Sequence, residues 1–153
     1  MEVVEIEANG NAPWEVLRKY GGKFRLFEKI KMGGVGSPKI VYHSGLEEID
    51  NLKEDVGSDL CYINFEFLKN GLLGRVNKGQ KLIGVIMHYD EIEKIFLSKN
   101  KLENPNDEAT IGRLAINSYS GEVLICEVTA QGYDGIEKFF RKHFVVDKFE
   151  LKH

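Results

Sequence analysis

One segment near the end of the chain carries the strongest structural signal, Gly132-Tyr-Asp-Gly-Ile-Glu-Lys-Phe-Phe-Arg-Lys-His-Phe144. Ile136, Phe140 and Phe144 recur at intervals of four residues, which places them on one stripe of a helix. Charged residues fill the other side, and basic side chains crowd the last turns, where they suit the helix dipole. The pattern predicts an amphipathic helix over residues 132–144 whose apolar stripe covers a β-sheet.

Short strand patterns dominate the rest of the chain. Runs rich in β-branched and aromatic residues predict strands at residues 2–8, 23–31, 39–43, 60–67, 72–76, 81–88, 92–97, 111–117 and 122–129. Helical spacing predicts short helices at residues 14–20 and 46–56, and residues 147–153 are expected to add a last edge segment. These elements indicate a mainly β protein of the α+β class, an antiparallel β-roll or partial barrel closed by the C-terminal helix.

Length and composition indicate one globular domain. A chain of 153 residues is most simply a single domain, and it is long enough to bury a core without metals or disulfides. Residues 59–146 hold the clearest signals and are interpreted as the core, with residues 1–58 as an N-terminal extension of strands and short helices. The net charge of −3 is mild, so general affinity for nucleic acid is not expected.

Several features favour a cytoplasmic location. The N-terminus alternates acidic and apolar residues, whereas a signal peptide would begin with basic residues and continue with an apolar run. No apolar run is long enough to cross a bilayer. Cys61 and Cys126 lie inside apolar segments, and we interpret them as buried free thiols rather than as a disulfide.

Three sequence segments show a resemblance to a known family: Leu72-Leu-Gly-Arg-Val-Asn-Lys78, Ile86-Met-His-Tyr-Asp-Glu-Ile-Glu-Lys-Ile95 and Gly135-Ile-Glu-Lys-Phe-Phe140. The middle segment contains a Tyr-x-x-Ile-x-x-Ile pattern at Tyr89, Ile92 and Ile95. Residues 60–146 thereby resemble the bacterial PH-like and GRAM-type domains. The resemblance implies a binding scaffold without catalytic residues of its own, in a family whose members bind inositol lipids, peptides or other proteins. The residues before the matching region must then supply extra strands or a covering helix.

No motif in the sequence identifies a reaction. A phosphate-binding loop needs a lysine and a hydroxyl at the start of a helix, whereas Gly33-Gly-Val-Gly-Ser-Pro38 ends in proline and is followed by a β-like segment, so we expect a mobile hairpin loop there. The histidines have no partner at metal-ligand spacing, and neither a metal nor a cofactor is expected. A small enzyme with a site of scattered residues remains an alternative, and a deep polar cleft around His43 or His88 would favour it.

Charge is unevenly distributed in the first half of the chain. Residues 18–42 contain seven basic residues against one acidic residue, whereas residues 46–60 contain six acidic residues against one basic residue. The basic block either pairs with the acidic block or forms an anion-binding face. The candidate residues of that face are Lys23, Arg25, Lys29, Lys31 and Lys39.

The geometry expected for this face follows from the predicted strand over residues 23–31. In a strand, the odd-numbered cations share one face, and Phe27 joins them in solvent. Phe24, Leu26 and Ile30 then point inward. Such a strip of cations with an apolar spot would suit a membrane surface or an acidic partner protein.

These observations favour a non-catalytic binding or assembly module with another protein as its partner. The alternatives are an anion-binding domain that attaches to an anionic membrane surface, and the small enzyme described above. A bare sheet edge would favour a protein partner, because an extended peptide can pair with it as an added strand. The sequence leaves the identity of the ligand and the oligomeric state open.

Overall fold

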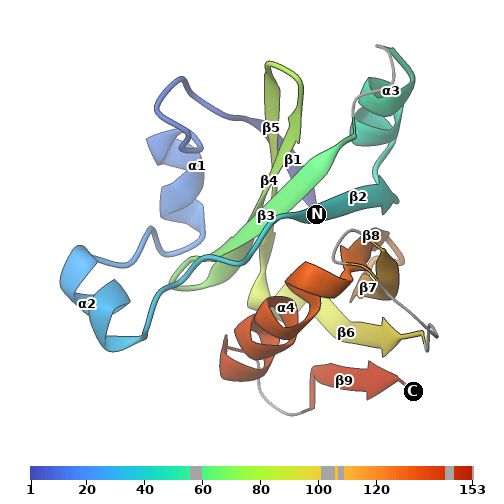
Figure 1. The fold of residues 1–153 in the computed structure, drawn as a ribbon. Helices are drawn as coiled ribbons and strands as arrows, with labels where there is room; N and C mark the ends of the chain where they lie inside the picture. Colours follow the sequence, from blue (N-terminus) through green and yellow to red (C-terminus); the bar gives the residue numbers. More distant parts are fainter. Residues whose placement is uncertain (56–59, 101–105, 107–108, 144–146, 153) are drawn as a thin grey trace.

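The computed structural model describes residues 1–55, 60–100, 106, 109–143 and 147–152. Within these residues, nine strands form one open sheet in the order β1-β5-β4-β3-β2-β8-β7-β6-β9 (Figure 1). The strands are β1 (Glu2–Glu5), β2 (Ile40–Ser44), β3 (Tyr62–Phe67), β4 (Gly71–Lys78), β5 (Lys81–His88), β6 (Ile92–Lys99), β7 (Thr110–Ser118), β8 (Val123–Thr129) and β9 (Phe149–Lys152). Neighbouring strands are antiparallel except β9, which lies parallel to β6.

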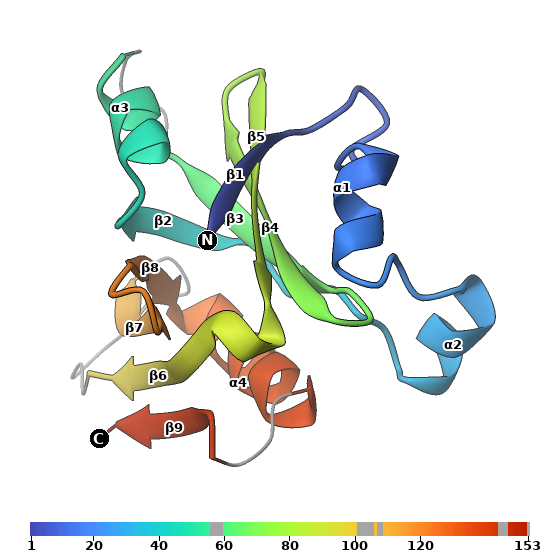
Figure 2. The same cartoon turned by 180° about the vertical axis from the view of Figure 1, so that it is seen from behind.

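Four α-helices and one short 3₁₀ helix, η1 (Tyr89–Glu91), accompany the sheet in the described residues. The α-helices are α1 (Trp14–Lys19), α2 (Leu26–Lys31), α3 (Glu47–Asp55) and α4 (Ala130–His143). The sheet curls so that β3, β4 and β5 face β6 and β7, and α4 crosses the open side between them (Figures 1 and 2). The predicted fold class is confirmed: a mainly β, α+β partial barrel closed by a C-terminal helix.

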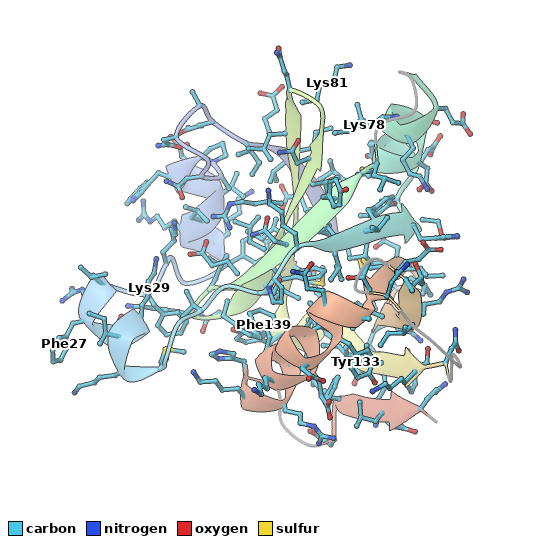
Figure 3. The ribbon with its side chains drawn as sticks, in the orientation of Figure 1. Phe27, Lys29, Lys78, Lys81, Tyr133 and Phe139 are labelled. Atoms are coloured by element: carbon cyan, nitrogen blue, oxygen red, sulfur yellow. The ribbon has the colours of Figure 1, made fainter. Side chains whose placement is uncertain are left out.

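The main core lies between the curled sheet and α4. Ile136 and Phe140 of α4 are completely buried. Phe139, labelled in Figure 3, stacks on Phe67 of β3 with ring centroids 4.3 Å apart, and Phe140 meets the edge of Phe65 at 5.7 Å. Aromatic pairs in these geometries add to the stabilisation from buried area. The prediction that this helix covers the sheet is therefore confirmed, with Phe140 among its most buried residues.

A smaller core lies on the outer face of β4 and β5, beneath α1. Leu17 and Tyr20 pack there against Leu73 and Ile86. The Tyr20 hydroxyl also donates a hydrogen bond of 2.8 Å to the carboxylate of Glu2 on β1. The first residues of the chain thus share both a sheet and a core with the central strands.

The predicted strand over residues 23–31 is wrong. Residues 26–31 form α2, and the nearest strand pairing is an isolated bridge between Lys23 and Leu68. The apolar spacing suits one side of a helix as well as a bulged strand. The helix is favoured locally because the Glu28 carboxylate accepts a hydrogen bond of 2.8 Å from the Arg25 backbone N–H, which caps its first turn.

The predicted hairpin loop at residues 33–38 is also wrong in form. Gly33 and Gly34 end α2, and the following residues pair with β3. The Val35 carbonyl accepts a hydrogen bond of 2.9 Å from the Phe67 N–H, so this segment extends the line of β2 along β3.

Other predicted elements are confirmed. Short helices occur at α1 and α3, and the last strand, β9, pairs at the edge of the sheet. Cys61 and Cys126 are buried and free. Among the described helices, none has the length and the apolar character that crossing a bilayer requires.

Candidate functional site

α2 projects from one end of the molecule and buries none of its side chains (Figure 1). Leu26, Phe27 and Ile30 are 75%, 68% and 67% exposed, and Trp14 on the neighbouring α1 is 66% exposed. Figure 3 shows Phe27 at the outer edge of the molecule. We call the exposed side chains of α1, α2 and the loop between them the tip surface. Its members are Trp14, Glu15, Arg18, Lys19, Arg25, Leu26, Phe27, Ile30 and Lys31, so one acidic side chain accompanies four cations.

Backbone contacts to the β3–β4 turn hold the loop that leads to α2. Gly21 and Gly22 have φ angles of +78° and +76°, in the left-handed region that glycine tolerates best. The Gly22 carbonyl accepts a hydrogen bond of 3.0 Å from the Lys69 N–H. A Cβ at Gly21 would lie 2.8 Å from the Asn70 side-chain nitrogen, so glycine is required for this close approach.

A buried carboxylate on β3 anchors the same segment from the side of the sheet. Glu66 is 7% exposed, and Arg75 on β4 donates a hydrogen bond of 2.6 Å to it. The ammonium groups of Lys23 and Lys29 each lie 3.5 Å from the Glu66 carboxylate. Burial raises the pKa of Glu66, but the hydrogen bond and the nearby positive charges outweigh burial and hold that pKa below its usual value. Glu66 therefore attaches the loop before α2, through Lys23, and α2 itself, through Lys29, to the sheet.

The five residues of the predicted anion face occupy three different environments. Lys23 and Lys29 are held by the buried carboxylate. Arg25 and Lys31 belong to the tip surface. Lys39 lies elsewhere, against a cavity of about 560 Å³ beside β2 and β8. The expected strip of cations along one strand face does not form, because α2 turns these residues around a helix.

The acidic block does not neutralise the tip surface. α3, which carries most of that block, lies at the opposite end of the molecule from α2 (Figures 1 and 2). Among the described residues, no ion pair joins residues 18–42 to residues 46–55. Of the two arrangements left open by the sequence, the described residues show the one in which the blocks stay apart.

A cavity of about 590 Å³ opens between α1 and the loop before α2. Arg18, Lys23, Arg25 and Lys69 contribute its positive lining, and Trp14 contributes its apolar wall. The Arg18 guanidinium lies 5.1 Å from the centroid of the Trp14 ring, within the range of a cation–π contact. This end of the molecule thus combines positive charge with exposed apolar groups at close range.

The enzyme alternative gains no support from the two histidines singled out by the sequence. His43 Nδ1 lies 2.8 Å from the Ser44 hydroxyl and its Nε2 lies 4.0 Å from Glu127, on the surface of β2. His88 stacks on Tyr20 with ring centroids 4.4 Å apart. Neither histidine lines the cavity beside α1, the cavity beside β2 and β8, or the cavity against α4. In the described part of the chain, no group of three or more His, Cys, Asp or Glu side chains could hold a metal ion.

Comparisons with known proteins give no further assignment. No protein-family model matches the chain, and no curated protein or solved structure matches it.

Sequence analysis found only part of the tip surface. It predicted the exposure of Phe27, which is confirmed, but it placed Leu26 and Ile30 inside the protein, which is wrong. The signal that could have found them is the run of apolar residues at helical spacing among cations, with glycines directly after it.

Proposed function

We propose that this protein is a non-catalytic binding module that attaches to anionic membrane surfaces through the tip surface. The observation that carries the proposal is α2, a helix without a buried side chain that exposes Leu26, Phe27 and Ile30 beside cations. Contiguous exposed apolar groups are uncommon on proteins that act alone, and they mark interaction sites.

The tip surface has the composition of an interfacial membrane anchor. Leucine, isoleucine and phenylalanine side chains enter the boundary between head groups and acyl chains, and tryptophan prefers the head-group level. The cations Arg18, Lys19, Arg25 and Lys31 would face anionic head groups, and each Lys or Arg near such a surface contributes about 1 kcal/mol. Apolar insertion and charge attraction would therefore act together.

The shape of the tip favours a bilayer over a folded protein partner. α2 lies at the far end of the molecule and stands away from the sheet (Figures 1 and 2). A protein partner would have to supply a groove that matches this projection, whereas a bilayer adapts to inserted side chains. An acidic protein is accordingly the weaker match.

The strand order supports the PH-like resemblance as the scaffold of this module. β2–β5 form one antiparallel run and β6–β8 form a second, β2 pairs with β8, and α4 closes the structure. On this proposal, β1, α1, α2 and β9 are additions, and the tip surface belongs to the added helices. A cytoplasmic location is part of the proposal, supported by the two buried free thiols and by the anionic lipids of the cytoplasmic leaflet.

A protein partner bound by strand addition is the second candidate. The observation that favours it is that, within the described residues, β1 pairs with β5 alone and β9 pairs with β6 alone, so each has an edge without a described neighbour. Both edge strands have four residues, which limits the hydrogen bonds that an added strand can form. This candidate therefore ranks below the membrane surface.

Vesicle co-sedimentation tests the proposal. Wild-type protein is mixed with phosphatidylcholine vesicles that contain or lack phosphatidylglycerol, at low salt. The charge variant R18Q/K19Q/R25Q/K31Q leaves the pairs to Glu66 intact. A control variant with the same change in net charge alters exposed cations elsewhere: K81Q/K99Q/R113Q/K152Q.

We expect the wild type and the control variant to sediment with the anionic vesicles only, and the charge variant to stay in solution. Sedimentation of the wild type should be lost by about 0.5 M salt, because screening then acts within a few ångströms. The membrane proposal would be rejected if the wild type failed to sediment, or if both variants sedimented to the same extent with anionic vesicles. A protein partner would then be the better hypothesis.

A further inference from the structure

A third cavity, of about 380 Å³, lies between α4 and the segment that follows α2. Gly33, Gly34 and Gly36 form one wall, and Lys138 and Lys142 of α4 stand on the other. Phe139 also lines the cavity, and its ring is stacked against the core of the protein. The lining of this cavity thus comes from two segments that are distant in the sequence.

Among the described residues, no acidic side chain lies against the positive charge of this cavity. Lys138 and Lys142 are four residues apart on one helix, an arrangement in which like charges repel. None of the described lining residues is acidic, and no ion pair to either lysine occurs within the described residues. The nearby carboxylate of Glu137 is already paired with Arg141 at 3.0 Å. An anion in the cavity would remove the repulsion between the two lysines.

The glycine wall carries no side chains, and the Gly33 and Gly34 amides already donate hydrogen bonds of 3.1 Å and 2.8 Å to the Ile30 and Lys29 carbonyls, so the two lysines supply the contacts to a ligand. A Cβ at Gly33 would lie 2.7 Å from Lys142 Nζ, and a Cβ at Gly135 would lie 2.6 Å from the Pro38 ring. These distances place the Lys142 ammonium group against the backbone of Gly33 and the Pro38 ring against α4, whereas a Cβ at Gly34 would meet nothing within 4 Å. Gly33 has a φ of +70°, so the chain turn at this wall also depends on glycine.

We propose that this cavity is a binding site for a small phosphate-bearing anion, held between the ammonium groups of Lys138 and Lys142 and the glycine wall. Ammonium groups bind phosphate oxygens through charge-assisted hydrogen bonds. His143 also lines the cavity; its ring hydrogen-bonds to the Gly34 backbone, and its ring centroid lies 3.9 Å from that of Phe67, which fixes its position. The site goes beyond the proposed function, since it involves none of the side chains of the tip surface.

Binding at this site would connect α2 to the body of the protein. Gly33 and Gly34 follow Met32, the residue at the C-terminal end of α2, whereas both lysines belong to α4, which packs on the core. A bound anion would bridge the two segments and restrict the position of α2. The phosphate group could belong to a molecule in solution or to a lipid head group next to the tip surface.

The first experiment follows the amide resonances of labelled protein during titration with inorganic phosphate, at constant ionic strength kept with sodium chloride. Saturable shifts of the Gly33, Gly34 and Gly36 amides are expected in the wild type. The variant K138Q/K142Q should bind at least about tenfold more weakly, since it loses two charge-assisted contacts. Both lysines are exposed, so the variant should keep the wild-type spectrum elsewhere.

The control variant K81Q/K99Q carries the same change in net charge and should bind phosphate as the wild type does. Absence of saturable shifts at the three glycines, or equal weakening in both variants, would overturn the proposal.

A second experiment compares vesicles with phosphatidic acid and with phosphatidylglycerol at equal surface charge. A preference for phosphatidic acid that K138Q/K142Q abolishes would assign the phosphate to a lipid. Glycine shifts without that preference would assign it to a soluble molecule. Sedimentation of K138Q/K142Q with phosphatidylglycerol vesicles shows that the tip surface itself still functions.

Discussion

Replacing Leu26, Phe27 and Ile30 by glutamine would separate the apolar contribution of the tip surface from its charge. Glutamine forms helices well, and none of these side chains is buried, so α2 and the fold should persist. A control variant, L60Q/Y119Q, removes exposed apolar side chains at distant positions that are 57% and 67% exposed.

The expected effect follows from the exposed fractions. Full burial of a Leu, Ile or Phe side chain is worth about 1.5–3 kcal/mol. Since about two-thirds to three-quarters of each residue is available for burial, each would contribute about 1–2 kcal/mol on insertion. The lower end of this range gives about 3 kcal/mol for the three together, which corresponds to about a 100-fold change in affinity.

The assay is a titration of the protein with phosphatidylglycerol vesicles at fixed salt, read by sedimentation and by the fluorescence of Trp14. We expect the triple variant L26Q/F27Q/I30Q to bind about 100-fold more weakly and L60Q/Y119Q to bind as the wild type does. Trp14 is the single tryptophan of the chain, so a blue shift on binding would report its transfer to the interface.

A triple variant that binds anionic vesicles as tightly as the wild type would refute the insertion of α2. Attachment would then be purely electrostatic, and the exposure of these three side chains would need another explanation. Thermal unfolding of each variant without vesicles checks that a loss of binding is not a loss of fold.

Four further predictions concern stability and cysteine chemistry. The pKa of Glu66 is lower in the folded protein than in the unfolded chain, so ionised Glu66 stabilises the fold. This stabilisation should be present above the unfolded pKa of about 4.3 and should be lost as the pH falls through the folded-state pKa. Denaturant titrations at several pH values should show the loss in the wild type and not in E66Q. At neutral pH, E66Q should itself cost about 3–5 kcal/mol, because three cations lose their common counter-charge, and a loss under about 1 kcal/mol would contradict the anchoring role. Phe140→Ala should lower the free energy of unfolding by about 3–5 kcal/mol in urea denaturation, and near-wild-type stability would show that α4 is peripheral. Cys61 and Cys126 should react slowly with a thiol reagent in the native protein and rapidly in urea, since burial raises the pKa of both thiols; a disulfide detected by mass spectrometry would contradict this.

The fold could be predicted because its main signals are local. The stripe of α4 repeats over several turns, and the strands after residue 60 are separated by strong turn signals such as Asn70-Gly71. Each of these patterns specifies one type of element without help from distant residues. The parallel pairing of β9 with β6 has no local signal, because the sequence shows an edge strand but not its neighbour.

The tip could not be predicted because its conformation depends on distant contacts. Residues 23–31 fit a bulged strand and a helix about equally well in their apolar pattern. The buried carboxylate of Glu66 adds to the local cap from Glu28 by binding Lys23 and Lys29, which a flat strand would present to solvent along one face. These ion pairs join residues about forty positions apart, so the spacing of residues 23–31 alone does not reveal them.

The anion cavity shows a similar limit. The glycines at 33–36 were recognised as unusual, and Lys138 and Lys142 were recognised as helix-end cations, but nothing in the sequence relates the two groups. Only the packing of α4 on the curled sheet brings them to opposite sides of one space. The sequence therefore identified the parts of this site without their arrangement.

The absence of buried side chains on α2 has a consequence for how this protein can change over evolutionary time. Folding places almost no demand on the identity of Leu26, Phe27 and Ile30, so random drift should replace them with polar residues at little cost in stability. Their retention in this chain would have to reflect selection for something other than folding. If orthologues keep apolar residues at these three positions, the surface of α2 is under selection. If polar residues replace them freely, the exposed side of α2 is not under selection.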